Sequence, residues 1–231
     1  MSSEVSTKPA APARAAEFSG IRINLGCGIV ALEGWENYDK SPVMLLRKVP
    51  FLLSTLVKLK ILTPSHVQTW PKNVKRRDLT KPLPQKDKTV EAIYSSHMFE
   101  HVYLTEAQAL AKEAFRVMKP GGILRLALPD GELWARQLIE SNGDAEAGAH
   151  YNERLGSYPV VRPKGRRLFT FMLGGSAHKW QPTRGLVKSM LEDAGFTNFR
   201  ELEYQKGDLP QVTEVEVRPE SMFFEAVRPI D

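Results

Sequence analysis

Two features near the start of the chain have residue types and spacing that could bind a small ligand. An apolar run over residues 21–25 ends in the triplet Gly26-Cys27-Gly28, which predicts a buried strand that leads into a tight loop. Two glycines in such a loop allow main-chain N–H groups to face a ligand without a Cβ in the way. A second run over residues 35–39 predicts a strand whose last residue, Asp39, lies where a carboxylate would meet the hydroxyls of a ribose.

The same loop narrows the class of nucleotide. A dinucleotide fingerprint needs a third glycine three residues after Gly28, and Ala31 stands there instead. A phosphate-binding Gly-Lys-Ser/Thr sequence is also absent. A glycine loop and a strand-end acid without phosphate-binding residues suit a nucleoside that carries no phosphates, of which S-adenosylmethionine is the common example. We expect Gly26, Cys27, Gly28 and Asp39 to bind it.

The most specific pattern lies between residues 90 and 130. A predicted strand at 90–94 leads through a Glu-His pair into a helix, which ends in the run Arg116-Val117-Met118-Lys119-Pro120-Gly121-Gly122 before a strand at 123–128. This block and the glycine loop resemble class I S-adenosylmethionine-dependent methyltransferases. Only residues 29–34 separate the glycine loop from the second strand, so the usual first helix must be very short or replaced by a turn. In this respect the chain is similar to a small subgroup associated with sugar and cell-surface polysaccharide modification.

The resemblance implies an α/β fold and further contacts to the cofactor. We expect a Rossmann-like, seven-stranded, mostly parallel sheet with an antiparallel last strand, flanked by helices, with two insertions over the active site. The ligand site then lies at the carboxyl ends of the strands. After the third strand, Asp78 is expected to accept the adenine amino group beside Leu79, and after the fourth strand Ser96 and His97 are expected near the cofactor.

Capping residues indicate where the helices that position these groups begin and end. Thr105 and Gln108 form a capping-box pattern, and Asp130 and Thr183 are predicted to begin two later helices. Residues 119–122 are expected to end a helix and turn the chain into the next core strand.

A methyl donor supplies its own electrophile, so the protein must supply alignment and, for a hydroxyl acceptor, a base. Carboxylate or imidazole groups suit that role, and Asp130, His150 and His178 are the candidates, with His178 and Asp130 preferred. Each has a second interpretation, because Asp130 could serve only as a helix cap and His178 could be a surface or cap histidine.

Residues 97–101 spell His-x-x-Glu-His, a pattern found in zinc proteases. A zinc site of that type needs both histidines on one continuous helix and a third ligand. Here the segment directly follows a predicted strand and precedes a separate helix. We therefore expect no metal, and assign Glu100 and His101 structural or active-site hydrogen bonds.

Composition sets the remaining limits. The 231 residues suit one domain over 19–231 after a disordered tail at 1–18, with insertions at about 41–73 and 142–180. A single cysteine excludes a disulfide framework, and the lack of an apolar leader favours a cytoplasmic location. The net charge of +5 mildly favours anionic partners.

The first insertion is apolar and basic over residues 43–62, and Pro50 is expected to divide it into two short helices. It is either a helical cap on the domain, or a substrate lid or membrane-surface helix that gives peripheral membrane contact.

Together these features predict transfer of a methyl group to a hydroxyl of a sugar or glycan. The alternatives are a lipid-like or quinone acceptor, and a non-catalytic module that keeps the fold. A nucleic-acid substrate is not expected, because no aromatic-interleaved RNA-binding module is visible. The sequence leaves the oligomeric state open.

Overall fold

The computed structural model describes residues 20–41, 70–156 and 177–230, together with the single residues Met44, Phe51, Thr55 and Lys58. These four single residues are helical. The bounds of the helices expected around Pro50, the tail at 1–18 and part of the second insertion lie outside the described residues. None of the helices in the described part is long and apolar enough to cross a membrane.

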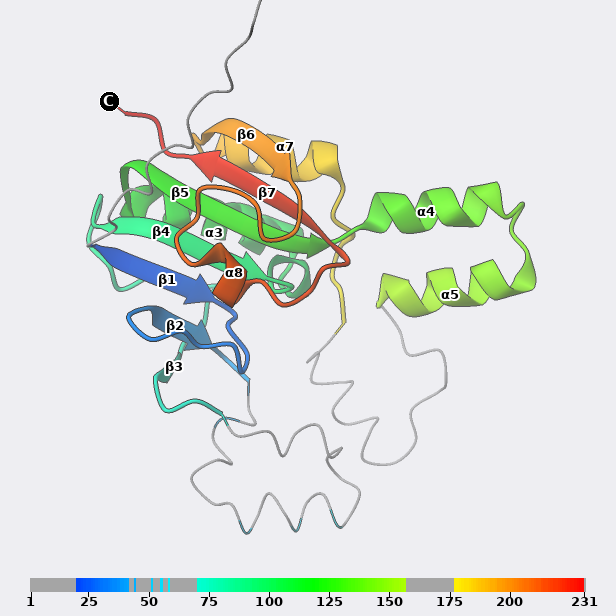
Figure 1. Ribbon diagram of the computed structural model, residues 1–231, viewed down its shortest axis with the longest axis horizontal. Helices are drawn as coiled ribbons and strands as arrows, with labels where there is room; N and C mark the ends of the chain where they lie inside the picture. Colours follow the sequence, from blue (N-terminus) through cyan, green and yellow to red (C-terminus); the bar gives the residue numbers. More distant parts are fainter. Residues whose placement is uncertain are drawn as a thin grey trace, which may run out of the picture.

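The centre of the fold is a seven-stranded sheet with strand order β3-β2-β1-β4-β5-β7-β6 (Figure 1). Only β7 runs antiparallel to its neighbours β5 and β6, and the other pairs are parallel. The predicted sheet, with its antiparallel last strand, is therefore confirmed. The strands are β1 (Ile21–Leu25), β2 (Glu36–Asp39), β3 (Val74–Arg76), β4 (Val90–Ser96), β5 (Met118–Pro129), β6 (Thr197–Leu202) and β7 (Ser221–Val227).

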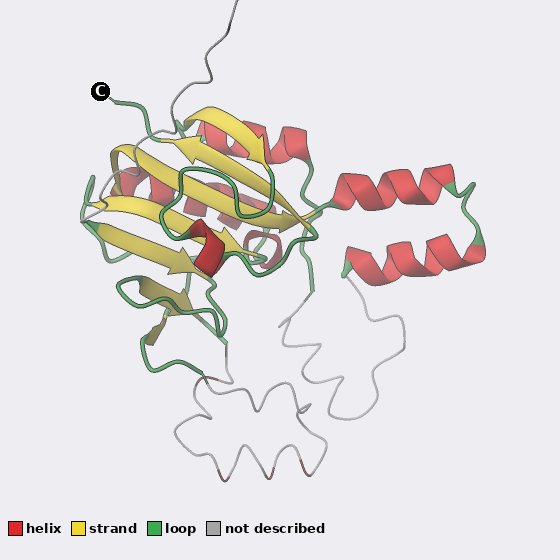
Figure 2. Ribbon diagram, in the orientation of Figure 1, coloured by secondary structure: helices red, strands yellow, loops and turns green. Residues whose placement is uncertain are grey.

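Apolar side chains are buried on both faces of this sheet. On one face, α3 (Leu104–Val117) and α7 (Arg184–Asp193) pack side by side over the strands (Figure 2). On the other face, the short helix α8 (Val212–Val215) and its flanking segments cover a smaller cluster that includes Trp35, Tyr94 and Phe223. The layers thus sandwich β1, β4 and β5 and leave the carboxyl ends of the strands for a site.

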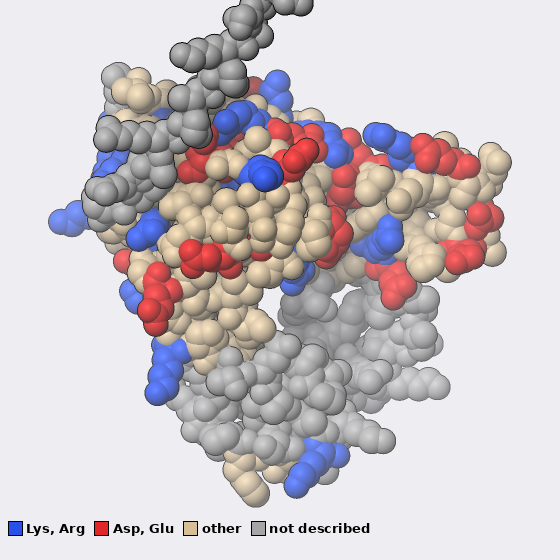
Figure 3. Space-filling view, viewed as in Figure 1, with Lys and Arg blue, Asp and Glu red and all other residues tan. Residues whose placement is uncertain are grey.

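The remaining helices form an arm that projects from the sheet. Helix α4 (Gly131–Glu140) runs outward and α5 (Ala145–Leu155) returns beside it (Figure 1). Neither helix contains a buried residue, and acidic and basic side chains are spread along the arm (Figure 3). Of this antiparallel pair, only α5 lies within the predicted second insertion at about 142–180. Residues 157–176 lie outside the described part.

Two local predictions about helix α3 were wrong. The helix begins at Leu104, where the side chain of Glu106 accepts a hydrogen bond of 2.9 Å from the N–H of Tyr103, so Thr105 and Gln108 are not the capping pair. At the other end, residues 119–122 are an irregular part of β5. Gly122 is confined there, because a Cβ would lie 2.9 Å from the carbonyl oxygen of Lys119.

The predicted caps of α4 and α7 are confirmed. Asp130 Oδ1 accepts a hydrogen bond of 2.8 Å from the N–H of Leu133. Thr183 Oγ1 accepts one of 3.3 Å from the N–H of Leu186. Both caps satisfy a backbone donor that the first helical turn leaves without a partner.

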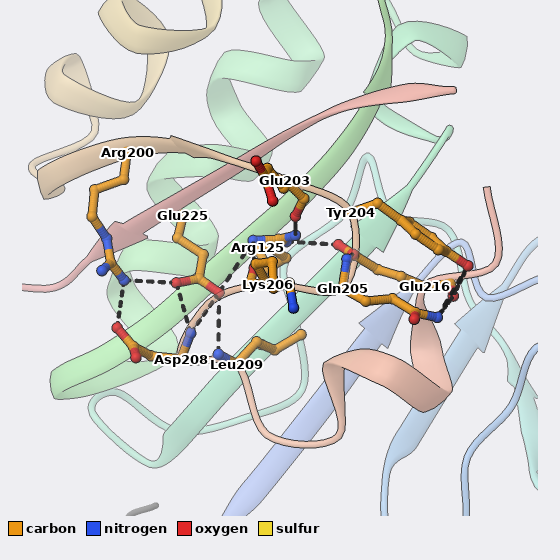
Figure 4. Close-up of polar contacts among 10 residues, drawn as sticks. All are labelled: Arg125, Arg200, Glu203, Tyr204, Gln205, Lys206, Asp208, Leu209, Glu216 and Glu225. Carbon is orange, nitrogen blue, oxygen red and sulfur yellow. Dashed lines mark hydrogen bonds and ion pairs between the residues drawn. The ribbon is translucent and has the colours of Figure 1, made fainter. Parts of the chain in front are cut away.

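A fully buried arginine, Arg125 in β5, ties α8 and its flanking loop to the sheet (Figure 4). Its Nε donates a hydrogen bond of 2.6 Å to Glu216, and its Nη1 lies 3.4 Å from Glu225. The same guanidinium donates to the carbonyl oxygens of Lys206 and Glu203 at 2.7 and 3.2 Å. Both carboxylates are fully buried, so the charges compensate one another away from water.

Glu225 in β7 extends this network to the rest of the loop. Its carboxylate accepts hydrogen bonds of 3.1 Å from the N–H groups of Asp208 and Leu209. Arg200 in β6 pairs with the same carboxylate at 2.8 Å. Charged hydrogen bonds, rather than apolar packing alone, therefore fix the path of residues 203–216.

This network predicts a large effect of removing the buried charge. Arg125→Leu leaves Glu216 buried without its cationic partner and leaves Glu225 with Arg200 alone, and we expect it to lower the free energy of unfolding by about 3–5 kcal/mol. Urea denaturation measures the change. The matched control is Arg136→Leu at an exposed position of α4, which should change stability by less than about 0.5 kcal/mol. Equal stability of the two variants would contradict a structural role for Arg125.

Candidate functional site

A cavity of about 530 Å³ opens at the carboxyl ends of β1, β2 and β4. Its volume lies within the roughly 300–1,000 Å³ of small-molecule sites. The glycine loop forms one side, the end of β4 forms the floor, and the segment after α8 forms another side. The lining residues are Asn24, Gly26, Cys27, Gly28, Ile29, Val30, Asp39, Trp70, Tyr94, Ser96, His97, Val215, Val217 and Arg218.

The glycine loop is a turn, as expected, and no helix joins β1 to β2. The N–H groups of Gly26 and Cys27 both donate to the carbonyl oxygen of Tyr38, at 2.8 and 3.1 Å, so the loop folds back over β2. Both glycines have positive φ. A Cβ on Gly26 would lie 2.4 Å from Met98, whereas one on Gly28 would meet nothing within 4 Å. Gly26 is thus required for packing, and Gly28 leaves open space where a ligand can approach the backbone.

Two buried asparagines hold this turn, and the sequence reading missed both. Asn24 donates a hydrogen bond of 2.8 Å to the carbonyl oxygen of Val30. Asn37 donates to the carbonyl oxygens of Leu32 and Trp35 at 2.9 and 3.0 Å. An amide at the middle of each apolar strand was the available signal, because a buried amide needs a backbone partner.

Asp39 lies in the cavity wall, at the predicted end of β2. Its Oδ2 accepts a hydrogen bond of 2.9 Å from the N–H of Gly28, and its Oδ1 accepts one of 2.7 Å from the N–H of Ser41. A carboxylate has about four lone-pair sites. The remaining ones can accept ribose hydroxyls while the backbone bonds hold the group in place.

Cys27 faces the interior and is 6% exposed. Burial, with a smaller contribution from the charge of Asp39, raises the pKa of its thiol to about 12. Because the thiolate is the reactive form, Cys27 is not a nucleophile at neutral pH. Its role in the loop is that of a small apolar residue.

Asp78 and Leu79 lie apart from the cavity lining. Asp78 pairs with Lys40 at 2.7 Å and accepts hydrogen bonds from Thr80, and these contacts lower the pKa of its carboxyl to about 2. Leu79 is buried in the main core. The predicted contact of these residues with adenine stays a prediction, and the Lys40 pair competes with it.

Ser96 and His97 line the cavity, and His97 continues into a second group of side chains. His97 has a φ of +47° and its Nε2 lies 2.8 Å from the hydroxyl of Ser221. Its Nδ1 lies 3.4 Å from Oε1 of Glu100. Nε2 of His101 and Nε2 of His178 lie 3.9 and 4.0 Å from the same oxygen. We call these four residues the histidine cluster.

The backbone around the histidine cluster is closely tied. Glu100 and His101 belong to the short helix η2 (Phe99–His101), and the carbonyl oxygen of Glu100 accepts a hydrogen bond of 2.7 Å from the N–H of Lys179. The N–H of His178 donates to the carbonyl oxygen of Gly156 at 3.1 Å. Gly156 has positive φ, and a Cβ there would lie 2.9 Å from His178 Nδ1. Burial lowers the pKa of His178, and the charge of Glu100 opposes this.

The other proposed bases lie outside the cavity. Asp130 caps α4 and pairs with Arg184 at 3.0 Å, contacts that favour a structural role. His150 lies exposed on α5, 3.9 Å from Glu146. The structure therefore brings His178 together with His97, and brings neither Asp130 nor His150 to them.

The buried thiol allows a test of the loop. Cys27 is the single cysteine, so we expect iodoacetamide at pH 8 to alkylate the native chain about 10³-fold more slowly than the urea-unfolded chain, following the difference in thiolate population. Mass spectrometry measures the rate, and glutathione in the same urea corrects for reagent reactivity. Equal rates in the two states would contradict a buried, protonated thiol.

Comparison with known proteins gives a match to one family model and many similar solved structures. Residues 59–126 match the model of a methyltransferase domain, a region that contains β3, β4, α3 and most of β5. The match does not include the glycine loop. A search of curated protein sequences finds no significant match.

Solved structures that are similar to this chain have low sequence identity to it. An S-adenosylmethionine-dependent methyltransferase from Methanosarcina mazei superposes with a TM-score of 0.51 and 18% identity, over 94% of this chain and 96% of that one. A "possible exported protein" from Bordetella parapertussis gives 0.47 and 16%, over 91% and 62%. Phosphoethanolamine N-methyltransferase 2 from Haemonchus contortus, in complex with S-adenosyl-L-methionine, gives 0.45 and 13%, over 91% and 49%. This chain thus spans less than two thirds of the last two proteins.

A nucleoside cofactor fits three features of the cavity: the open space at Gly28, the free lone pairs of the Asp39 carboxylate, and the cavity volume. Residues 59–126 thus resemble a methyltransferase domain, and the chain shares the fold of a solved S-adenosylmethionine-dependent methyltransferase.

Proposed function

We propose that the chain is an S-adenosylmethionine-dependent methyltransferase, and that it transfers the methyl group to a hydroxyl of a sugar or glycan. The observation that carries this proposal is the position of the histidine cluster. His97 lines the cofactor cavity on one side and contacts Glu100 on the other, so the cluster adjoins the place where a methyl group would be presented.

A hydroxyl acceptor needs this kind of environment. Aliphatic hydroxyls are weakly acidic, and a carboxylate or imidazole must receive the proton during the transfer. The histidine cluster offers one buried carboxylate and three imidazoles within 4.0 Å of it. An amine acceptor with a free lone pair would need no such group.

The roles of the chain's own residues follow from their contacts. S-adenosylmethionine supplies an electrophilic methyl group on a sulfonium. The glycine loop and Asp39 hold the nucleoside, and the histidine cluster orients the hydroxyl. The histidine cluster would accept the proton that the hydroxyl loses on methylation and release it to solvent.

The choice of a sugar is supported by the short turn between β1 and β2, the feature that resembles the sugar-associated subgroup. Transfer from radiolabelled cofactor to a panel of glycans, lipid-linked acceptors, quinones and RNA tests this choice. Labelling of a glycan, with the methyl group found on oxygen by mass spectrometry, is expected. Labelling confined to another class would replace the sugar, and labelling of nitrogen would overturn the hydroxyl proposal.

The cofactor contact predicts a loss of affinity at Asp39. Asp39→Ala should weaken binding of S-adenosylmethionine by about 1.5–3 kcal/mol, because it removes charged hydrogen-bond acceptors and frees the N–H of Gly28. Calorimetry measures the affinity, with Glu33→Ala, at an exposed position of the same turn, as control. Unchanged affinity would remove Asp39 from the cofactor site.

The proton-transfer role predicts a different result at His178. His178→Ala should lower turnover by roughly 10²–10⁴-fold and leave cofactor affinity almost unchanged. Asp130→Asn, measured in parallel, should mainly lower the melting temperature, since Asp130 caps α4 and pairs with Arg184. Near-normal turnover in the His178 variant and collapse in a stable Asp130 variant would transfer the role to Asp130.

A further inference from the structure

The carboxylate of Glu100 lacks the partners that a buried charge requires. Glu100 is fully buried, and no described residue donates a hydrogen bond to either of its oxygens. Removing an uncompensated carboxylate from water costs several kcal/mol. Its nearest polar neighbours are imidazole nitrogens: Nδ1 of His97 lies 3.4 Å away, and Nε2 of His101 and of His178 lie 3.9 and 4.0 Å away, which is too long for hydrogen bonds. A cation or a proton is therefore needed among these groups to compensate the carboxylate.

The outward-facing nitrogens of the histidines show where that charge belongs. Nδ1 of His101 faces the carbonyl oxygen of Ala177 at 3.4 Å, which favours a proton on Nδ1 and a free lone pair on Nε2. In His178, Nδ1 lies against the Gly156 backbone and Nε2 faces Glu100. Two imidazole lone pairs and a carboxylate oxygen thus converge, and backbone groups orient the rings from behind, as in metal sites.

We propose that Glu100, His101 and His178 bind a divalent transition-metal ion, with zinc as the best match. In the described part of the chain this is the one group of three such side chains whose ligand atoms lie within 4.8 Å of one another. Two histidines and a glutamate make up known catalytic zinc sites, which keep a further position open for water or substrate.

The geometry is near that of a bound metal. Metal bonds of about 2.0–2.1 Å in a tetrahedron place ligand atoms about 3.3 Å apart, so the observed 3.9 and 4.0 Å must shorten by about 0.6 Å. The side chains of His101 and His178 remain 32% and 14% exposed, which leaves a path for the ion. The zinc-protease pattern was rejected from the sequence because its two histidines were not expected on one continuous helix, and the site proposed here uses only His101 and Glu100 of that pattern. Here the third ligand, His178, comes from 78 residues away.

This inference rests on the proposed hydroxyl transfer for its function. A divalent cation next to the cavity would lower the pKa of a coordinated hydroxyl and orient it. The histidine cluster without a metal ion would do this less well. His97, between the cavity and Glu100, would hold the carboxylate from the other side as a positioning residue.

Metal content tests the site independently of any acceptor. The chain is purified without a histidine tag, stripped with a chelator, and titrated with Co²⁺ and with Zn²⁺ as competitor. One equivalent with a visible tetrahedral or five-coordinate Co²⁺ spectrum is expected. His178→Ala and the isosteric Glu100→Gln should weaken binding by about 100-fold or more, beyond the 10–100-fold typical of outer-shell changes.

The matched control is His150→Ala, which removes an exposed histidine that also faces a glutamate, Glu146. It should bind Co²⁺ like the unaltered chain. Circular dichroism shows whether each variant is folded, and a rise of the melting temperature with Zn²⁺ in the unaltered chain gives a readout that needs no variant.

The outcomes separate the two proposals. Failure of the folded, unaltered chain to bind Co²⁺ or Zn²⁺ at micromolar concentrations overturns the metal site. Glycan methylation that persists undiminished in chelator also overturns it while the hydroxyl transfer stands. Binding of one metal ion without methylation of any hydroxyl acceptor keeps the site and overturns the proposed function.

Discussion

The buried ion pair of Arg125 with Glu216 and Glu225 is the constraint on which the shape of the site depends. The cavity at the carboxyl ends of the strands is lined on one side by the glycine loop and on another by Val215, Val217 and Arg218. These residues end or follow the four-residue helix α8, which is too short to be stable by its own hydrogen bonds. Charged bonds from β5 and β7 hold it instead. A second tie comes from Gln211, whose side chain accepts hydrogen bonds from Arg22 and Trp35 at 2.9 and 2.8 Å.

This arrangement divides the molecule into parts with different sources of stability. The face under α3 and α7 is held by apolar packing. The opposite face combines a small apolar cluster with the buried charges. Removing one partner of either buried ion pair is costly. Because charged hydrogen bonds are directional, these pairs fix the position of the cavity wall more precisely than apolar contacts would.

Local patterns were sufficient to predict the sheet, the glycine turn, the position of Asp39, and the caps at Asp130 and Thr183. Each of these depends on residues close in sequence. The role of Arg125 could not be predicted in this way, because a charged residue within an apolar strand normally faces solvent. The meeting of Glu100 with His178 depends on the fold that brings distant loops together. The start of α3 was wrong because Glu106 and Tyr103 satisfy the same backbone groups that Thr105 and Gln108 could have.

The backbone conformation of His97 affects how the cavity and the histidine cluster are held relative to each other. A side chain with a φ of +47° occupies a conformation that costs about 1–3 kcal/mol for residues other than glycine. Glycine at this position would remove the backbone strain, but it would also remove the imidazole ring that lies between the cavity and Glu100. His97 belongs both to the cavity lining and to the histidine cluster, and its strained conformation lowers the stability of the fold at that residue. The N–H of His97 donates a hydrogen bond of 2.9 Å to the carbonyl oxygen of Ala127 in β5, the strand that also contains Arg125. The same strand therefore positions both the cavity wall and the histidine cluster.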